Sequence, residues 1–313
     1  MDKSDSTRTQ HGAAQRWIDP AVLSRLGNLE LLAKTVVDGM LTGLHRSPNF
    51  GFSQEFAEYR AYNEGDDLRF VDWNVYARTD RTYIKRFRGD TNTALTILLD
   101  ASGSMGFGAS DGAGNQGVRK IDYARYVAAS LAYMAKRQHD AIGLVVFDDE
   151  VRQVIPPASR PDTLPRIFTA LDKSDAAAGT DIEGALESLH TLAGKRGLLA
   201  VISDFYTDPE KLLESLQPLV HRQQDIMLIH LLDPMELAPS FDSIVSLSDL
   251  ESKSRTDVDP QWLMSTYRER IDAHCKELES QTLRAGAEYR RVETNEALDD
   301  ALYRYLLFRQ RKQ

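Results

Sequence analysis

The sequence contains a single cysteine, Cys275, among 313 residues. An intramolecular disulfide therefore cannot form, and a zinc site built from several cysteines is excluded. No stretch approaches the about 18 to 20 consecutive apolar residues that a membrane-spanning helix needs, and residues 1–18 lack the apolar segment of a signal peptide. We therefore expect a soluble, cytoplasmic protein with no membrane span.

Positive charge is also scarce in this chain. It has 38 Lys and Arg residues against 47 Asp and Glu residues, which gives a formal net charge of -9. A protein that binds nucleic acid normally gathers an excess of basic residues on one face, so we expect no nucleic-acid partner. The Walker lysine motif of nucleotide hydrolysis and the His-Glu-x-x-His motif of zinc catalysis do not occur either.

The length exceeds that of one average domain. Residues 1–18 are polar and predict a disordered tail. Residues 19–92 predict one long amphipathic helix, residues 20–44, followed by a small β-rich segment. Residues 93–250 predict the main domain, and residues 251–313 a helical extension with a short strand, packed on that domain.

From residue 93 onward, short apolar segments alternate with amphipathic helical patterns. Such alternation predicts an α/β fold with a mostly parallel sheet and helices on both of its faces. Strands are expected at residues 94–99, 141–147, 151–155, 198–202, 226–232, 244–247 and 288–292, and helices at residues 121–136, 161–171, 181–192, 209–222, 260–284 and 295–309.

Oxygen-bearing side chains are concentrated where the first of these strands ends, in Asp100-Ala-Ser102-Gly-Ser104. In doubly wound sheets, ligands bind outside the carboxyl ends of the strands. Thr180, just before a helix, and Asp204, just after another strand, are expected at the same edge. Hard divalent cations prefer oxygen ligands, so these five residues predict a site for one such ion. With few charged ligands, the ion would remain open to an outside carboxylate.

Simpler roles fit the same residues. Asp100 and Ser104 could form a turn and a helix cap, Thr180 could cap its helix, and Asp204 could belong to another turn. In that case the protein would be a metal-free interaction scaffold. The sequence leaves both alternatives open.

An enzymatic alternative is a serine hydrolase that uses Ser104. The run Ser102-Gly-Ser104-Met-Gly106 nearly matches the nucleophile elbow of hydrolases, and Asp204 and His230 follow in hydrolase order. However, the first glycine of the elbow is missing, and His230 falls inside an apolar strand. We therefore expect a buried structural histidine and no enzyme.

The Asp-x-Ser-x-Ser run, the later threonine and the later aspartate resemble the metal-ion-dependent adhesion site of von Willebrand factor A domains. This resemblance implies that Asp100, Ser102, Ser104 and Thr180 hold a magnesium ion, with manganese or calcium as alternatives, and that Asp204 orients its waters. It also implies a client protein that supplies a carboxylate to the metal.

The preceding segment resembles the N-terminal signature of the DUF58 family, with Glu58-Tyr-Arg60-x-Tyr62, Gly65-Asp66-Asp67-x-Arg69 and Val71-Asp72-Trp73. The resemblance implies a cytoplasmic, von Willebrand factor A-like protein that works with a MoxR-type AAA+ ATPase. We predict a metal-dependent protein-binding module that acts as an adaptor or co-chaperone in the maturation or assembly of other proteins.

The same segment interleaves acidic and basic side chains. We expect them to form a charge-paired network that holds the segment on the main domain, with Trp73 as an apolar anchor. The alternative is a docking face for a partner, since basic residues are locally enriched. The residues of the network are Arg60, Asp66, Asp67, Arg69, Asp72, Arg78 and Arg81, and those of the docking face are Arg78, Arg81, Lys85, Arg86 and Arg88.

Overall fold

The computed structural model describes most of the chain between residues 20 and 312. The predicted tail, residues 1–18, lies outside the described residues, as do Asp66, Asp67 and Arg69 of the predicted charge network. The described ranges are residues 20–23, 27–45, 55–62, 71–88, 94–108, 117–177, 179–192, 196–239, 245–248, 255–258 and 267–312.

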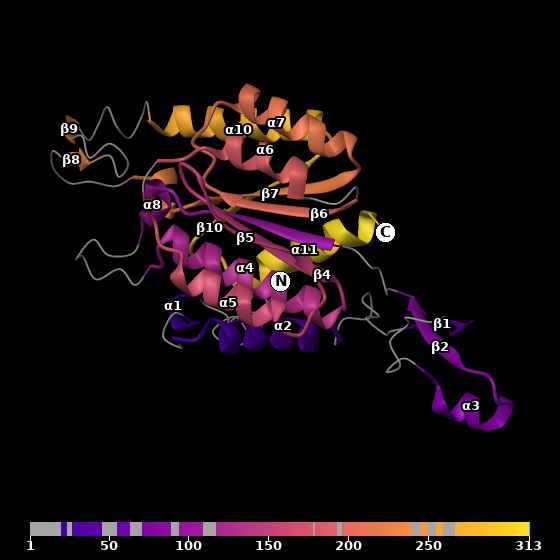
Figure 1. Ribbon diagram of the computed structural model, residues 1–313. Coiled ribbons are helices and arrows are strands. Elements are labelled where there is room, and N and C mark those ends of the chain that lie inside the picture. The colour runs from indigo at the N-terminus through magenta and orange to yellow at the C-terminus, as the bar shows by residue number, and fades with distance from the viewer. Residues whose placement is uncertain are drawn as a thin grey trace, which may run out of the picture.

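A six-stranded sheet forms the centre of the molecule, with strand order β10-β7-β6-β3-β4-β5 (Figure 1). All neighbouring strands are parallel except β5, which pairs antiparallel with β4 at one edge. The inner strands are apolar and buried along their length, as expected for a sheet covered on both faces. The strands are β3 (Ala94–Asp100), β4 (Ala141–Phe147), β5 (Val151–Ala158), β6 (Gly197–Ser203), β7 (Gln224–Leu232) and β10 (Glu288–Glu293).

Helices cover both faces of this sheet (Figure 1). One face packs against α4, α5 and α11, and the other against α6, α7 and α10. The predicted fold class, a mostly parallel α/β sheet between two helical layers, is confirmed. The helices are α4 (Lys120–Arg137), α5 (Thr163–Lys173), α6 (Ile182–Leu192), α7 (Pro209–His221), α10 (Arg268–Arg284) and α11 (Leu298–Lys312).

The N-terminal helical segment is broken where the apolar periodicity predicted one continuous helix. It forms α1 (Pro20–Leu23) and α2 (Leu29–His45). Gly27 has a positive φ of 59°, a conformation that ends a helix, and the Asn28 side chain accepts a hydrogen bond from Leu31 N at 2.9 Å. The glycine and the asparagine cap therefore explain why the prediction was wrong. Helix α2 packs on α4 as an outer layer (Figure 1).

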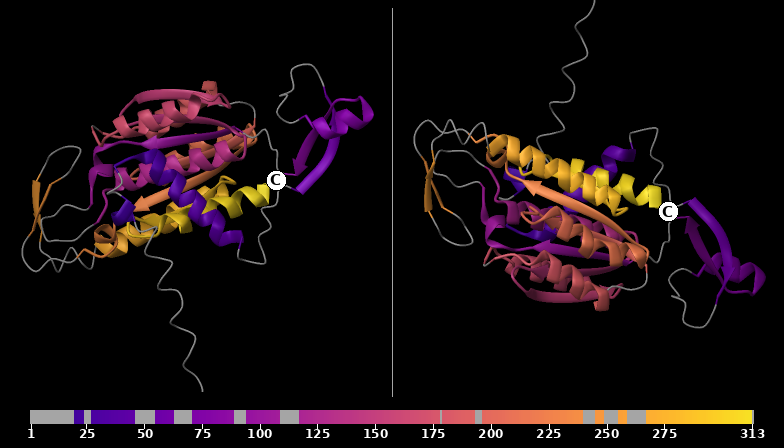
Figure 2. Two further views of the ribbon diagram at one scale, coloured as in Figure 1. Left: turned by 90° about the horizontal axis from the view of Figure 1, so that it is seen from below. Right: turned by 90° about the horizontal axis from the view of Figure 1, so that it is seen from above.

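An arm projects from the end of the sheet at which β3 begins (Figures 1 and 2). It consists of residues 55–62 and 71–88, in which β1 (Glu55–Ala61) and β2 (Tyr83–Arg88) form an antiparallel pair joined through α3 (Trp73–Thr79). The β-rich character of this segment was predicted, whereas the helix α3 within it was not.

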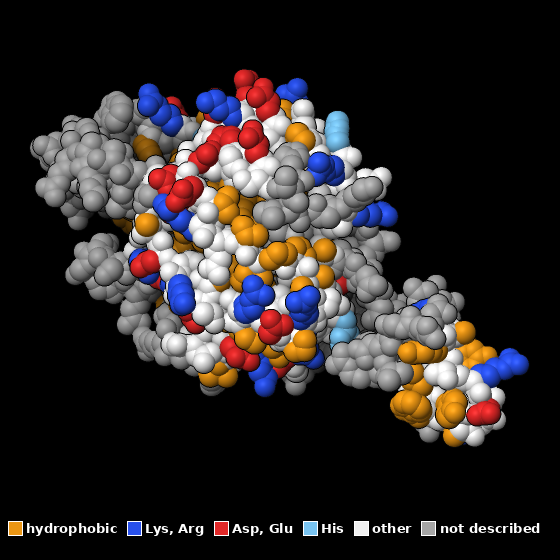
Figure 3. Space-filling view, in the orientation of Figure 1, with side chains coloured by type: hydrophobic (Ala, Val, Ile, Leu, Met, Phe, Trp, Pro, Cys, Tyr) orange, Lys and Arg blue, Asp and Glu red, His pale blue; other side chains and the backbone are white. Residues whose placement is uncertain are grey.

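Trp73 does not anchor the arm on the main domain, contrary to the prediction. Its side chain is 60% exposed and packs edge-on against Tyr76, with ring centroids 6.1 Å apart. Hydrophobic side chains are visible on the surface of the arm in Figure 3. Asp72, in contrast, is buried and accepts a hydrogen bond from Val75 N at 3.2 Å, which caps α3.

The part of the chain assigned to a C-terminal extension contributes to the main sheet, because β10 pairs along its length with β7. In the sequence between β7 and β10, β8 (Val245–Ser248) and β9 (Arg255–Val258) form a small separate antiparallel pair. This pair lies at the opposite end of the molecule from the arm (Figures 1 and 2). Within the described ranges, every helix is too short or too polar to cross a bilayer.

Candidate metal centre

Asp100 and Asp204 meet at the topological switch point of the sheet. From β3 the chain continues to β4 and β5 on one side, and then returns to β6 and β7 on the other. Asp100 is the last residue of β3, and Asp204 directly follows β6, the parallel neighbour of β3. Ligands of open α/β sheets bind at this crevice, so the fold brings both carboxylates to the place where a ligand is expected.

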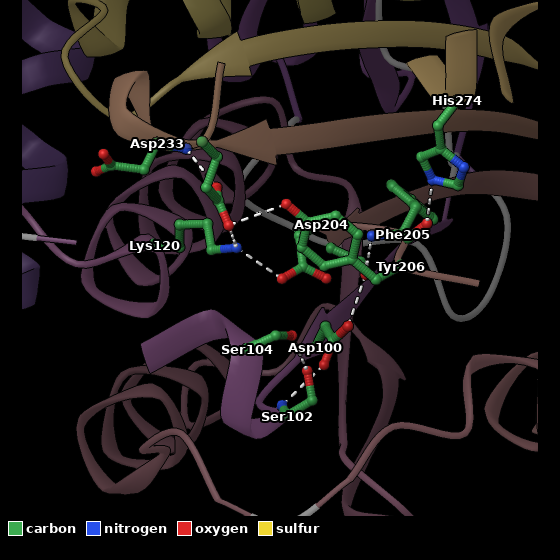
Figure 4. Close-up of polar contacts among 11 residues, drawn as sticks. Asp100, Ser102, Ser104, Lys120, Asp204, Phe205, Tyr206, Asp233 and His274 are labelled. Atoms are coloured by element: carbon green, nitrogen blue, oxygen red, sulfur yellow. Dashed lines mark hydrogen bonds and ion pairs between the residues drawn. The ribbon is translucent and has the colours of Figure 1, made fainter. Parts of the chain in front are cut away.

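The Asp100 carboxylate is buried and held on both of its oxygens. Oδ1 accepts a hydrogen bond from Ser102 N at 2.8 Å, and Oδ2 accepts one from Ser203 Oγ at 2.6 Å (Figure 4). The hydroxyl oxygens of Ser102 and Ser104 lie 3.1 Å apart beside it. Ser104 belongs to η4 (Gly103–Gly106), a short 3-10 helix that turns both serines toward the strand end (Figure 4).

Thr180 lies on a loop that crosses the ends of β3 and β4. Ala177 N donates a hydrogen bond to Ala101 O at 3.0 Å, and Asp181 N donates one to Asp148 O at 2.8 Å. These two bonds fix the loop next to the residue that follows Asp100. The loop with Thr180 is therefore at the same edge of the sheet as the two aspartates.

The Thr180 hydroxyl does not cap helix α6. That role falls to Asp181, whose side chain accepts a hydrogen bond from Gly184 N at 2.9 Å. Within the described residues, Thr180 Oγ1 is a buried oxygen with no hydrogen-bond partner. A buried polar atom without a partner costs free energy, and the cap was the simpler explanation for this threonine. The Thr180 oxygen is therefore available to a partner from outside the described chain, such as an ion or a water.

The Asp204 carboxylate is paired with Lys120, a residue that the sequence analysis missed. Lys120 Nζ lies 2.8 Å from Asp204 Oδ2 and 2.6 Å from Glu236 Oε1, and all three side chains are buried (Figure 4). Lys120 is the first residue of α4, where the helix dipole disfavours a basic residue. A basic residue at the start of a helix was the one sequence signal that marked Lys120 as unusual.

The surroundings of Asp100 and Lys120 shift the pKa values of both groups. Burial raises the pKa of Asp100 to about 7, and the negative charge of Asp204 adds to the rise, although hydrogen bonds from Ser203 and Ser102 oppose it. For Lys120, burial lowers the pKa, but the two carboxylates beside it outweigh burial, so its pKa lies above the ordinary value. A cation close to Asp100 would relieve the repulsion between the two aspartates.

The donors at this edge fit a magnesium ion. Adjacent ligands of an octahedral magnesium at about 2.0–2.1 Å lie about 3 Å from each other, which matches the 3.1 Å between Ser102 Oγ and Ser104 Oγ. Thr180 Oγ1 could supply a further oxygen, because it has no hydrogen-bond partner among the residues that the structure describes. In the part of the chain that the structure describes, three or more His, Cys, Asp or Glu side chains nowhere gather as metal ligands, so hydroxyl groups would have to hold the ion.

The backbone after Asp204 is strained. Phe205 has a positive φ of 47°, which is unfavourable for a residue with a side chain. Its carbonyl oxygen lies 2.9 Å from His274 Nε2, and its amide donates to Ser203 Oγ at 2.9 Å (Figure 4). These contacts hold the turn that presents Asp204 and connect the candidate metal centre to α10.

The contacts of His230 favour a structural role. It is buried inside β7, and its Nδ1 lies 2.6 Å from Tyr289 Oη. Burial lowers the pKa of His230 to about 3, with a further contribution from His274. Among the described residues, Ser104 makes no hydrogen bond to a histidine, which is the usual general base for a serine nucleophile.

These observations define a doubly wound α/β protein with an oxygen-rich site at the switch point of its sheet. The sequence profile of the family described as "Protein of unknown function DUF58" matches residues 58–280. The chain belongs to this family, as its N-terminal signature predicted. A relative is the uncharacterized protein Mb1516 of Mycobacterium bovis, which is 27% identical over 237 residues, or 75% of this chain and 72% of that protein.

Solved structures with similarity to this chain include the conserved hypothetical protein BatB from Bacteroides thetaiotaomicron. The two share 15% identity with a TM-score of 0.47, over 69% of this chain and 97% of BatB. The von Willebrand factor type A structure from Catenulispora acidiphila shares 12% identity with a TM-score of 0.40, over 74% of this chain and 43% of that chain.

Proposed function

We propose that this chain is a metal-ion-dependent protein-binding module. Asp100, Ser102, Ser104 and Thr180 would hold a magnesium ion, with manganese or calcium as alternatives, and Asp204 would orient its waters. The observation that carries the proposal is the buried Thr180 hydroxyl, which has no partner within the described residues and lies on a loop fixed beside the end of β3.

The composition of the site supports binding in preference to catalysis. One carboxylate and three hydroxyl groups neutralise little of a divalent charge, so the bound ion would supply an electrophilic centre that accepts a further oxygen ligand. A Glu or Asp side chain of a client protein would complete its coordination. The alternatives are a metal-free scaffold and a serine hydrolase that uses Ser104, and neither accounts for the Thr180 oxygen.

The family resemblance supports an adaptor or co-chaperone that works in the cytoplasm with a MoxR-type AAA+ ATPase in the maturation or assembly of client proteins. The shape of the molecule is compatible with two partners at once, because the arm and the metal centre lie at opposite ends of β3 (Figure 1). We assign the client to the metal centre and the ATPase to the arm, where Trp73 and Tyr76 are exposed beside basic residues.

The test is a titration with Mn2+, a spectroscopic stand-in for magnesium, in which the free ion is counted by electron paramagnetic resonance. The wild type is expected to bind one ion, and Asp100→Asn to lose binding at least about tenfold, because it removes the main charged ligand. Asp148→Asn is the matched control, since Asp148 is buried at the end of the neighbouring strand and pairs with Arg152. Equal binding by wild type and Asp100→Asn would refute the proposal.

A further inference from the structure

The ammonium group of Lys120 is shut away from solvent at the metal centre. Its side chain has no exposed surface, although lysine is among the residues least often buried. The rings of Tyr206 and Phe107 lie 5.1 Å and 5.8 Å from Nζ. Both rings are themselves partly exposed, so they separate the ammonium from the surrounding water.

Glu236 fixes the lysine in this place. One of its oxygens, Oε1, accepts from Lys120 Nζ at 2.6 Å and from Tyr206 Oη at 3.0 Å (Figure 4). The other, Oε2, accepts from Asp233 N at 2.7 Å, which completes the capping box of α8 (Pro234–Leu237). Since both carboxylate oxygens of Glu236 are engaged, the lysine is held beside Asp204 by a rigid partner.

Stability alone gives little reason for this arrangement. Removing two charges from water costs about as much as their attraction returns, and replacing a buried ion pair with apolar residues is often neutral or stabilising. The arrangement does, however, change the charge that a cation would meet. Asp100, Asp204 and Glu236 bring three carboxyl groups to this region, and the positive charge of Lys120 lies directly beside two of them, Asp204 and Glu236.

We propose that Lys120 is a built-in counter-ion that occupies one oxygen of Asp204 and limits the affinity of the metal centre for free divalent cations. Tight binding of the ion would then require the carboxylate of a client protein. This inference rests on the proposed function and adds to it a reason why the client and the metal bind together. In a buried site the ammonium repels a nearby cation with little screening by water.

Two substitutions distinguish a counter-ion role of Lys120 from a purely structural role. Lys120→Met removes the positive charge but keeps most of the side-chain volume, and Glu236→Gln leaves the ammonium paired with Asp204 alone. Both break the ion pair between Lys120 and Glu236, so a purely structural role predicts loss of metal binding in both. The counter-ion role predicts opposite effects, because the first variant removes a positive charge from the site and the second removes a negative one.

The experiment measures Mn2+ binding to full-length protein by electron paramagnetic resonance, with thermal unfolding in EDTA as a check on folding. We expect Lys120→Met to bind Mn2+ at least about tenfold more tightly than wild type and Glu236→Gln to bind it about threefold to tenfold more weakly. Arg119→Met is the matched control. Arg119 precedes Lys120, but its guanidinium is directed to Asp122 and Asp175 at 2.8 Å and 3.1 Å.

The outcomes distinguish the two proposals. Weaker binding by both variants, or no change in either, overturns the counter-ion role while the metal-binding function stands. Absence of Mn2+ binding in wild type and in Lys120→Met overturns both proposals. If Lys120→Met does not fold, Glu236→Gln carries the test, and unchanged or tighter Mn2+ binding by this variant overturns the counter-ion role.

Discussion

At the scale of single residues, Thr180 gives the most direct test of whether a hydroxyl group binds a metal ion or has only a structural role. Its Oγ1 atom is buried and lacks a hydrogen-bond partner in the described part of the chain, while the neighbouring Asp181 caps α6. A buried hydroxyl of this kind costs stability unless a ligand satisfies it. Removal of this hydroxyl should therefore preserve or raise the stability of the metal-free protein but lower its affinity for the metal ion.

Thr180→Val replaces the hydroxyl with a methyl group of nearly the same size. In EDTA, we expect the variant to be as stable as wild type or about 1 kcal/mol more stable, because the unsatisfied oxygen is gone. Mn2+ affinity is expected to fall at least about tenfold, because one ligand is lost. Urea unfolding and metal titration measure the two effects.

The matched control for this substitution is Thr282→Val. Thr282 is also buried, but its Oγ1 donates to Leu278 O at 2.6 Å, so its loss should destabilise the protein by about 1 kcal/mol without changing metal affinity. If Thr180→Val behaves in the same way as this control, the Thr180 hydroxyl has a structural role and does not bind the ion.

His230 gives a prediction for the dependence of stability on pH. Burial lowers its folded-state pKa to about 3, below the ordinary value of 6.5. As the pH falls from 6.5 toward 3, the unfolded chain takes up a proton that the folded protein does not, so the free energy of unfolding decreases. The stability is fully present above pH 6.5 and is lost on acidification.

We therefore expect the difference in free energy of unfolding between wild type and His230→Gln to decrease by about 1.4 kcal/mol for each pH unit below pH 6. Chemical denaturation at pH 7, 6, 5 and 4.5 measures this slope. His221→Gln, on the exposed surface of α7, is the control for the loss of an imidazole. A difference that stays constant across this range would contradict the neutral, buried state of His230.

Individual residues also show which features of the candidate site could be predicted from the sequence and which could not. Asp100, Ser102 and Ser104 were identifiable because they lie within one local run at the end of an apolar strand. Lys120 was not, because its partner Asp204 is 84 residues away and only the fold brings them together. The same limit applies to Thr180: its hydroxyl is identifiable in the sequence, but its lack of a partner is a property of the folded surroundings.

At the scale of elements, strands were predicted more accurately than irregular connections. The strands of a two-sided parallel sheet are continuous apolar runs, and β3, β4, β6 and β7 begin and end close to their predicted limits. The N-terminal helix was predicted as one because apolar residues keep helical spacing across the break at Gly27 and Asn28. In this segment the backbone conformation of the glycine and the asparagine cap outweighed the periodicity.

Helix α11 is joined to the rest of the protein by a buried ion pair between Arg309 and Asp140, the residue that directly precedes β4. Removing one member of a buried pair leaves the other charge without compensation. We expect Arg309→Met to lower the free energy of unfolding by about 3–5 kcal/mol, measured by urea denaturation.

Arg166→Met is the control for that substitution. Arg166 pairs with Asp162 at 3.9 Å, and both side chains are largely exposed, so we expect a change within about 0.5 kcal/mol. A loss in Arg309→Met as small as the one expected for Arg166→Met would mean that the Arg309 pair contributes no more than a surface contact.

At the scale of the whole molecule, the two candidate binding regions are separated by the length of the central sheet. The candidate metal centre lies at the carboxyl end of β3, and the arm precedes the first residue of the same strand (Figures 1 and 2). The sequence predicted the order of these parts and the fold class, but not that the arm would project with Trp73 on its surface. The exposure of a side chain depends on what packs against it in the fold. The apolar character of Trp73 therefore did not indicate that its side chain would be exposed.

This separation predicts that the two binding activities can be removed independently. Trp73→Ser changes a side chain that is 60% exposed, so we expect the free energy of unfolding to change by less than about 1 kcal/mol and Mn2+ binding to remain as in wild type. If the proposed partnership holds, binding to a MoxR-type AAA+ ATPase, measured by surface plasmon resonance, should weaken at least about tenfold, since tryptophans dominate many interfaces. Leu283→Ser, at a leucine on α10 that is 56% exposed, is the matched control and should bind the ATPase normally.

Equal weakening by both variants would mean that the arm has no special part in recognition. Loss of ATPase binding in Asp100→Asn but not in Trp73→Ser would assign the ATPase to the candidate metal centre.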